Sequence, residues 1–286
     1  MRLKRTTERV SEDHAGLTAE DNFIFICHVA AYRFAIDYVR DADVLDLGCG
    51  TGFGSAMLAK HARSVVGVDV APDAVQFSTD RYGTSGDGNL TFRQIGPLPD
   101  TRMPFDDASF DVVICFQVIE HIHGVDSFLH EIARVIRPGG SLVMATPDRR
   151  WRLFDWQKPF NRFHVTEWNP QQMREIMGRV FPQVELFGMT APPEMLRIEL
   201  DRCRKLRLVA VPLTLPFIPE GLRLPALAAL THIRDFVRGV VGQLRGRKEH
   251  AEFNGREDDI TIAPNVSPST NIIAVARKAN EQSDLA

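Results

Sequence analysis

The sequence of 286 residues lacks the features that would place it in a membrane or on an export route. It contains no apolar run of about eighteen residues, so we expect no membrane-spanning helix. Its first residues, MRLKRTTERVSEDH, lack the apolar core of a secretory signal. Internal repeats and low-complexity tracts are absent as well. We therefore expect a cytoplasmic protein, and the one alternative kept open is a peripheral location at the inner face of the membrane.

Cysteine and excess charge are also scarce. The four cysteines, Cys27, Cys49, Cys115 and Cys203, form neither a C-x-x-C pair nor a metal-ligand spacing, which favours buried thiols in a reducing compartment. The net charge of −3 argues against a nucleic-acid-binding protein, which is usually basic. Hydrophobic residues at 44% and charged residues at 25% are typical of a globular protein.

Short apolar runs alternate with segments of helical periodicity. This alternation predicts βαβ units, and hence an α/β fold with a mainly parallel sheet and helices on both faces. Ligands of such sheets bind beyond the carboxyl ends of the strands. We expect strands at 44–48, 65–70, 90–95, 110–117, 141–147, 184–189 and 271–278, and helices at 22–40, 54–62, 72–82, 125–136 and 169–181.

Residues 192–250 break the alternation. They hold eleven Lys and Arg against six Asp and Glu, a net charge of +5. We expect a helical insertion at 192–268, an N-terminal segment with a capping helix at 1–40, and one core built from 41–191 and 269–280. The insertion is interpreted either as a weak membrane-surface contact or as a lid or homodimer contact, and we favour the latter. Its apolar stripe comprises Leu227, Leu230, Ile233, Val237, Val240 and Leu244.

The most informative local motif is DLGCGTGFG at 46–54, a strand that runs into a glycine turn and then a helix. Its glycines are spaced G-x-G-x-G, whereas a dinucleotide site needs G-x-G-x-x-G. The carboxylate of Asp46 would repel a pyrophosphate but attract a cation. S-adenosylmethionine carries an ammonium and a sulfonium, so it suits this turn. Asp69 ends the next strand, where a carboxylate can accept hydrogen bonds from both ribose hydroxyls.

Four motifs in order, VLDLGCGTG, VVGVD, FDVVICFQVIEH and RVIRPGGSLVMATP, resemble the class I S-adenosylmethionine-dependent methyltransferases. The resemblance covers about residues 24–190 and the closing strand at 271–278. It implies a Rossmann-like seven-stranded sheet of order 3-2-1-4-5-7-6 with an antiparallel last strand, and S-adenosylmethionine as cofactor. By motif, the cofactor-binding residues would be Asp46, Gly48, Gly50 and Gly52 at the methionine end, Asp69 and Val70 at the ribose, and Phe116 and Gln117 beside the sulfonium. Many relatives place an acidic residue after the third strand, where this chain has IGPLPD.

Methylation of a hydroxyl needs a general base or a metal near this edge of the sheet, because an alcohol is a poor nucleophile. The stretch QVIEHIHG at 117–124 supplies Glu120, His121 and His123. Quinone-biosynthetic O-methyltransferases resemble it, but some of them have E-x-x-E-H and bind a divalent metal there. Here Gln117 replaces one acidic ligand. Two interpretations stand: a Mg²⁺ site at Glu120 and His121, or residues that only organise the loop.

The segment WRLFDWQKPFNRFHVTEW at 151–168 contains all three tryptophans and a second candidate base, His164. It follows the fifth strand and should therefore lie over the active-site edge. We expect Trp151 and Trp156 to contact the acceptor, together with Tyr32 and Arg33 of the first helix. A wall for a sugar ring and an apolar lid are both consistent with this composition.

The AAYRFA helix, the N-x-F-H-V-x-E loop and the basic insertion together resemble methyltransferases of bacterial glycan or glycolipid assembly. The leading prediction is thus methyl transfer to a hydroxyl of a saccharide or lipid-linked saccharide. The alternatives are O- or C-methylation of a quinone or other aromatic metabolite, and a cofactor-binding scaffold without activity.

Overall fold

The computed structural model describes residues 18–83, 88–244 and 255–280, with the side chains of 233–244 left out. The strands are β1 Asp43–Leu47, β2 Ser64–Asp69, β3 Leu90–Gln94, β4 Phe110–Phe116, β5 Ile136–Pro147, β6 Gln183–Thr190, β7 Thr261–Ala263 and β8 Asn271–Arg277. The α-helices are α1 Ala19–Val39, α2 Phe53–Ala59, α3 Pro72–Tyr82, α4 Val125–Val135, α5 Arg149–Arg152, α6 Pro170–Met177, α7 Pro193–Ala210 and α8 Glu220–Leu244. Short 3-10 helices are η2 Ile119–His121, η3 Val211–Leu213 and η4 Glu257–Asp259.

All the strands form one sheet of order β3-β2-β1-β4-β5-β8-β6-β7. Strands β1 to β5 are parallel, and β8 lies antiparallel between β5 and β6. The predicted order is confirmed, with β7 added as a short eighth strand at the edge. Asp46 of β1 lies beside Ile114 of β4, so these two central strands end at the same edge of the sheet. That edge carries the glycine turn and the loop after β4.

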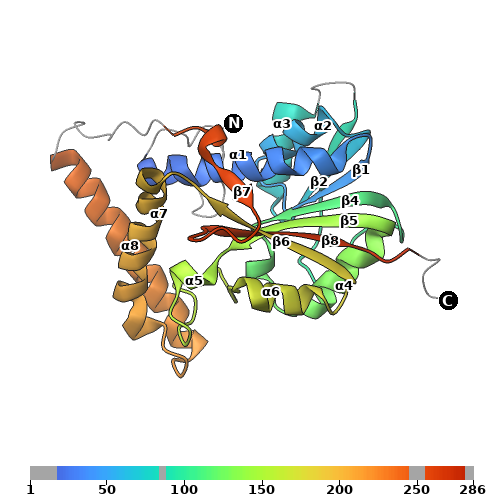
Figure 1. Cartoon of the computed structure of the whole chain (residues 1–286). Coiled ribbons are helices and arrows are strands. Elements are labelled where there is room, and N and C mark those ends of the chain that lie inside the picture. The colour runs from blue at the N-terminus through green and yellow to red at the C-terminus, as the bar shows by residue number, and fades with distance from the viewer. Residues whose placement is uncertain (1–17, 84–87, 245–254, 281–286) are drawn as a thin grey trace.

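The sheet is covered on both faces, with α1, α2 and α3 above it and α4 and α6 below it in Figure 1. Helix α4 presents an apolar stripe because Phe128, Leu129, Ile132 and Val135 recur at helical spacing, and all four are fully buried. On the other face, α1 buries Phe23, Tyr32, Ala35 and Val39. The four cysteines are unpaired and buried, as expected.

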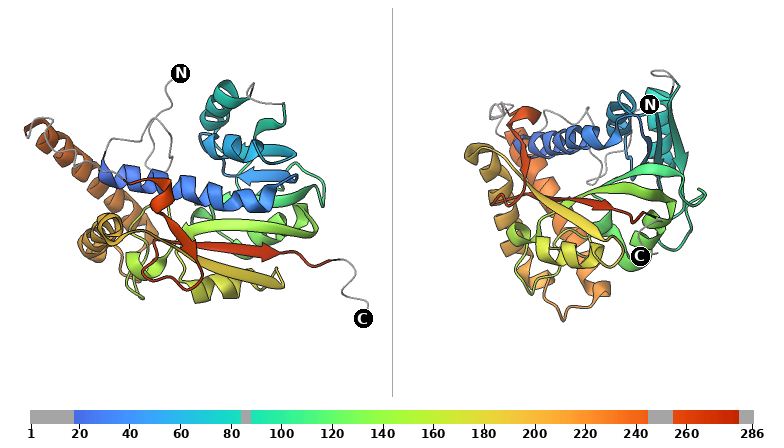
Figure 2. Two further views of the ribbon diagram at one scale, coloured as in Figure 1. Left: turned by 45° about the horizontal axis from the view of Figure 1, so that its top comes forward. Right: turned by 45° about the vertical axis from the view of Figure 1, so that its right-hand side comes forward.

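The insertion between β6 and β8 is more than a helical insertion. Helices α7 and α8 lie beyond the end of the sheet in Figure 1, and α8 projects away from it in the left view of Figure 2. The chain then returns through η4 and β7, and β7 pairs antiparallel with β6. The expected helical insertion at 192–268 thus contains α7 and α8, and its last part adds the short strand β7 to the sheet. The side chains of Ile233, Val237, Val240 and Leu244 lie outside the described set.

The short helix α5 is absent from the expected elements, whereas α7 lies within the expected helical insertion. Helix α7 has a mixed pattern in which Met195, Leu196, Glu199 and Cys203 are buried, so charged residues share its inner face. Within the described residues, no helix combines the length and apolar content that crossing a bilayer requires.

Candidate active site

The three glycines of the turn after β1 have different surroundings. All three have left-handed backbone, with φ of 80° at Gly48, 53° at Gly50 and 78° at Gly52. A Cβ on Gly48 would collide with Val118, and one on Gly52 would lie 2.7 Å from Cβ of Ser78. A Cβ on Gly50 would meet no atom within 4 Å. Gly50 is therefore the glycine that faces open space, and the other two permit packing against the loop after β4 and against α3.

Asp46 lies beneath the turn and is fully buried. Its Oδ2 accepts a hydrogen bond of 2.5 Å from the Ser55 hydroxyl, and its Oδ1 accepts one of 3.2 Å from the hydroxyl of Tyr32. Burial raises the pKa of this carboxyl to about 6, although the two hydrogen bonds oppose the shift. Direct contact between Asp46 and the cofactor stays a prediction. The structure shows a buried carboxyl group that is held in place by hydrogen bonds from Tyr32 and Ser55.

Asp69 occupies the end of β2 and is only partly buried. Its Oδ2 accepts from the backbone N–H of Gly50 at 3.0 Å, and its Oδ1 accepts from that of Ala71 at 2.9 Å. Each carboxylate oxygen can accept a further hydrogen bond. Next to it, Val70 is 52% exposed although it is apolar. Two hydrogen-bond-accepting oxygens beside an exposed apolar side chain suit a ribose with its attached ring.

Phe116 and Gln117 follow the same edge at the end of β4. The ring of Phe116 is buried and packs edge-on against Tyr32, with 4.9 Å between the ring centroids. Gln117 has a positive φ of 56°, and its side-chain amide donates to Oδ1 of Asn271 at 3.0 Å. The Gln117 side chain is thus engaged with β8.

Three potential proton acceptors gather beside this edge. Ligand atoms of Glu120, His121 and His164 all lie within 4.8 Å of one another. The two imidazole rings meet edge to face, with centroids 4.9 Å apart. The backbone carbonyl of Glu120 accepts from the N–H of Val165 at 2.7 Å, which ties the loop after β4 to the loop after β5. The structure therefore brings His164 next to the residues of the E-H motif. His123 is exposed and lies outside this cluster.

Hydrogen bonds define the orientation of both rings. Nδ1 of His121 lies 3.0 Å from the carbonyl oxygen of Phe163, and Nδ1 of His164 lies 2.7 Å from Oε1 of Glu167. A carbonyl oxygen only accepts, so Nδ1 of His121 carries the proton. Burial acts to raise the pKa of Glu167, but Arg152 and His164 hold it down to about 2, so this carboxylate also accepts. In each neutral ring the lone pair is consequently on Nε2.

A buried ion pair between Arg152 and Glu167 joins the two ends of the aromatic segment. Arg152 donates from Nε to Oε2 of Glu167 at 2.8 Å and from Nη2 to Oε1 at 3.2 Å. Arg149 adds hydrogen bonds to the backbone carbonyls of Asp155 and Gln157, at 2.8 and 2.9 Å. These contacts fix the path of the segment without a regular strand or helix. The sequence pattern did not indicate the roles of Arg149 and Arg152, because they stand out in it only as charged residues among aromatic ones.

The three tryptophans have three different environments. Trp168 is buried in the main core, whereas Trp156 is 47% exposed and stacks on Phe154 with 5.4 Å between centroids. Trp151 is half-buried, and its Nε1 is buried without a hydrogen-bond partner among the described residues. The contact of Trp151 and Trp156 with an acceptor stays a prediction, and Trp168 is a core residue.

Two further residues that we expected at the acceptor have other roles. Tyr32 is 4% exposed and lies between Asp46 and the Phe116 ring, so its expected contact with the acceptor is corrected. Arg33, on the outer side of α1, forms an ion pair with Asp258 of η4. It therefore connects α1 to the returning insertion. Both residues were selected from an aromatic motif that turns out to pack α1 on the sheet.

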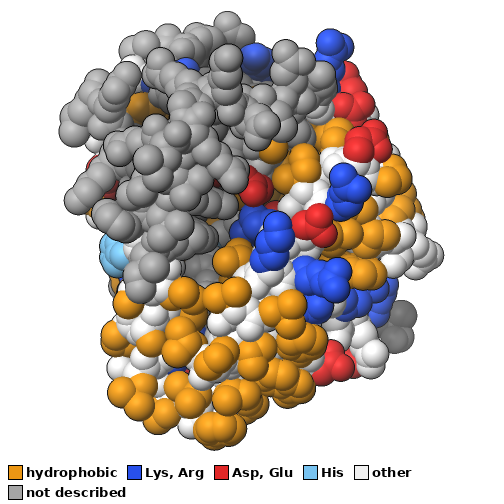
Figure 3. Space-filling view, turned by 90° about the vertical axis from the view of Figure 1, so that its left-hand side faces the viewer, with side chains coloured by type: hydrophobic (Ala, Val, Ile, Leu, Met, Phe, Trp, Pro, Cys, Tyr) orange, Lys and Arg blue, Asp and Glu red, His pale blue; other side chains and the backbone are white. Residues whose placement is uncertain are grey.

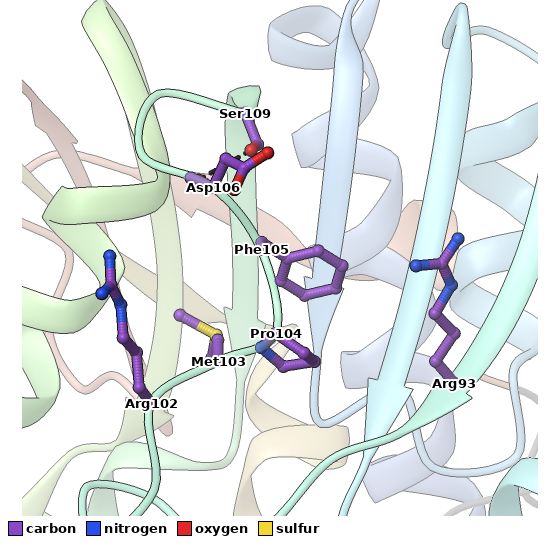
Figure 4. A pocket seen from close by; sticks show the side chains of 7 residues that line it. All are labelled: Arg93, Arg102, Met103, Pro104, Phe105, Asp106 and Ser109. Carbon is purple, nitrogen blue, oxygen red and sulfur yellow. Dashed lines mark hydrogen bonds between the residues drawn. The ribbon is translucent and has the colours of Figure 1, made fainter.

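A separate open pocket of about 510 Å³ lies beside the edge strand β3. Figure 4 shows Arg93 of β3 on one side and Phe105 and Pro104 of the segment before β4 on the other. None of its lining residues belongs to the glycine turn or to the Glu120 cluster. We therefore place the active site at the carboxyl edge of the sheet and not in this pocket.

Comparisons with known proteins indicate a methyltransferase domain. Residues 45–144 match a family model described as a methyltransferase domain. A probable S-adenosylmethionine-dependent methyltransferase of Mycolicibacterium smegmatis is 35% identical over 169 residues, which cover 58% of this chain and 62% of that protein. A demethylmenaquinone methyltransferase of Tropheryma whipplei is 33% identical over 102 residues, covering 36% of this chain and 40% of that protein.

Among solved structures, the cyclase SpnF has a TM-score of 0.56 at 16% identity, over 97% of this chain and 89% of that one. At this identity the similarity concerns the fold alone, and a cyclase on this fold shows that the fold does not decide the reaction.

In fold, motifs and relatives the chain is similar to the class I S-adenosylmethionine-dependent methyltransferases, and residues 45–144 match a methyltransferase domain. The residues present fit S-adenosylmethionine: Gly50 faces open space, and Asp69 retains acceptor capacity beside it. The chain spans about three-fifths of the length of the Mycolicibacterium relative, so acceptor and partners are matters of proposal.

Proposed function

We propose that this chain methylates a hydroxyl group of a saccharide or lipid-linked saccharide. The observation that carries the proposal is the position of Glu120, His121 and His164 at the same sheet edge as the glycine turn. Val118 connects the two, since it packs on Gly48 and lies two residues before Glu120. A hydroxyl that reached this cluster would be close to both the donor site and a proton acceptor.

S-adenosylmethionine supplies an electrophilic methyl group on a positively charged sulfur. The protein has to align the acceptor oxygen opposite that sulfur, and such alignment is worth up to about 7–11 kcal/mol. It must also remove the hydroxyl proton. Nε2 of His164 is suited to this, because Glu167 fixes the ring through Nδ1 and stabilises the imidazolium that forms. Removal of the proton contributes roughly 10²–10⁴-fold to the rate.

The surface beside the aromatic segment supports an acceptor that carries a lipid. Among the side chains that the structure describes, eight large hydrophobic ones are exposed. Five of them fall between positions 208 and 224, and we call them the apolar cap: Leu208, Val209, Phe217, Leu222 and Leu224. Figure 3 shows a broad field of hydrophobic side chains on this side of the molecule. Exposed apolar groups in such density mark a contact with lipid or with protein.

The apolar cap is connected to the acceptor segment. The side-chain amide of Gln157 donates to Thr214 Oγ1 at 2.8 Å, and Lys158 Nζ donates to the carbonyl of Ile218 at 2.9 Å. The buried guanidinium of Arg223 donates to the carbonyl of Pro159 at 2.7 Å. A lipid bound at the cap would therefore place its attached head group near the segment that contains His164.

Methylation of a quinone is the second candidate. It is favoured by the demethylmenaquinone methyltransferase among the relatives, and quinones also carry a long apolar tail. An exposed aromatic pair, Phe154 and Trp156, suits either a sugar or a flat ring.

The test is a transfer assay with methyl-labelled S-adenosylmethionine and two acceptor sets, extracted bacterial glycolipids and reduced quinone precursors. Label in the glycolipids that survives mild acid and base is the result expected for a methyl ether. Label only in the quinols would overturn the saccharide proposal and leave the methyltransferase assignment intact.

A further inference from the structure

The Glu120, His121 and His164 cluster has a second property that proton transfer does not require. Zn²⁺ and similar ions bind nitrogen and oxygen ligands at about 2.0–2.2 Å, which places neighbouring ligand atoms about 3–3.5 Å apart. Here the three ligand atoms already lie within 4.8 Å of one another. They come from η2 after β4 and from the loop after β5, which are joined by the Glu120 carbonyl. The backbone thus fixes all three.

Each imidazole has the outer contact that metal-binding histidines typically have. Nδ1 of His121 donates to a backbone carbonyl, and Nδ1 of His164 donates to the carboxylate of Glu167. Such contacts fix the tautomer and direct Nε2 toward the ion. Arg152 in turn holds Glu167, so the outer contact of His164 is itself buried and charged.

The third group is a buried carboxylate that is only half satisfied. Glu120 is fully buried, and its Oε2 accepts a hydrogen bond of 3.0 Å from the hydroxyl of Thr146. Its Oε1 is buried with no hydrogen-bond partner among the described residues. An isolated buried carboxylate is unfavourable by several kcal/mol, and a coordinated cation offsets that cost.

We propose that Glu120, His121 and His164 form a binding site for one divalent transition-metal ion. Two imidazoles and one carboxylate are ligands for Zn²⁺, Mn²⁺, Fe²⁺ or Co²⁺, whereas Mg²⁺ prefers oxygen ligands alone. The proposed site therefore differs from the Mg²⁺ site expected at Glu120 and His121. It has His164 as a third ligand, and it favours a transition metal. Gln117 stands where the E-x-x-E-H motif has its first acidic residue, and its side-chain amide donates a hydrogen bond to Asn271.

The ion would leave open coordination positions for the acceptor. Held by Glu120, His121 and His164, the ion would supply Lewis-acid chemistry, which would make a neighbouring hydroxyl more acidic. With the ion bound, Nε2 of His164 would be a metal ligand, so the proton-accepting role proposed for His164 applies to the metal-free protein. Metal binding is a property of the free protein, so it does not depend on the proposed acceptor.

The experiment is a titration of the metal-free full chain with Co²⁺, followed by visible absorption without any methyl donor. One ion per chain is expected, with bands of a site that contains nitrogen ligands. Glu120→Gln and His164→Asn should each weaken binding about 100-fold or more. The control is His130→Gln on the surface of α4, which should bind as the unchanged protein does. Circular dichroism and binding of S-adenosylhomocysteine establish that each variant is folded.

A milder variant separates a positioning effect from misfolding. Thr146→Val removes the hydroxyl that holds Oε2 of Glu120 and keeps the side-chain shape. We expect binding to weaken about 10- to 100-fold, as for other outer contacts of metal ligands. Absence of Co²⁺ and Zn²⁺ binding at millimolar concentration would overturn the metal site. So would equal binding by the Glu120 and His130 variants. Either result leaves the methyl-transfer proposal standing, with His164 as general base.

Discussion

Nδ1 of His164 and Oε1 of Glu167 are 2.7 Å apart inside the protein, and Arg152 contacts the same carboxylate from the other side. Burial alone disfavours the charged form of Glu167, yet the guanidinium and the imidazole keep its pKa near 2. The negative charge is therefore permanent at any physiological pH. It orients the ring and favours a positive charge or a metal ion on the far nitrogen of His164.

Removal of the imidazole should affect the chemical step and spare the donor site. We expect His164→Ala to lower kcat by about 10²–10⁴-fold, since a general base contributes that much. Binding of S-adenosylhomocysteine, measured by calorimetry, should change less than about twofold. Full activity in this variant would move the proton acceptor to His121 or His123.

Replacement of Asp69 should weaken binding of the donor. Asp69→Ala removes two oxygens that are positioned by the N–H groups of Gly50 and Ala71. A hydrogen bond to a charged group is worth about 1.5–3 kcal/mol, so donor affinity should fall about 10- to 100-fold. Asp80→Ala on the exposed side of α3 serves as the matched control. Equal affinities in the two variants would remove Asp69 from the donor site.

The glycine turn offers a pair of substitutions that differ only in their surroundings. Gly50→Ala introduces a methyl group into open space at a positive φ, which costs about 1 kcal/mol of stability but obstructs the donor. Gly48→Ala places the methyl group against Val118 and should lower the free energy of unfolding considerably more. Chemical denaturation and calorimetry on both variants measure the two effects. Normal donor affinity in a folded Gly50→Ala protein would contradict the placement of the donor.

The raised pKa of Asp46 predicts a pH dependence of stability. The ordinary value of 3.8 applies to the unfolded chain, and the folded value is about 6. A carboxyl group whose folded pKa is raised contributes its full stability below the unfolded pKa and loses it as pH rises through the folded pKa. Relative to Asp46→Asn, the free energy of unfolding should thus fall by about 2 kcal/mol between pH 4 and pH 8. Parallel pH profiles of the two proteins would show that Asp46 titrates normally.

The apolar cap predicts binding to lipid vesicles. The double variant Phe217→Glu/Leu222→Glu places two charges on side chains that are 76% and 69% exposed. We expect it to bind vesicles of phosphatidylglycerol and phosphatidylcholine at least tenfold more weakly. Lys60→Glu changes the net charge by the same two units at the exposed end of α2, far from the cap in Figure 1. If this control loses as much binding, or if the cap instead joins two copies in sedimentation, the lipid contact is wrong.

Much of the fold follows from the sequence because its signals are local. VLDLG and VVGVD predict their strands through apolar continuity, and the glycine turn follows from spacing alone. The boundary between the helix expected at 125–136 and the strand expected at 141–147 was less well predicted, because β5 already begins at Ile136. Short β7 has only three residues, too few to show a period.

The sequence predicted which residues belong to the site better than it predicted the contacts between them. Glu120, His121 and His164 were all selected, but their meeting depends on the bond between Glu120 and Val165, which joins two loops more than forty residues apart. The role expected for Tyr32 was wrong, because the sequence alone does not show whether an aromatic residue on a helix faces the acceptor or the core. Burial, which separates the two cases, is a tertiary property.

The ion pair between Arg152 and Glu167 has a consequence for how the acceptor range of such proteins can change. It closes the segment between these two residues at its ends, and the N–H of Arg149 donates to the carbonyl of Trp168 just outside. The intervening residues other than His164 and Val165 can then be replaced while the strands and the donor turn keep their places. We expect relatives to diversify by exchanging this loop, and grafts that retain both ends of the ion pair to fold.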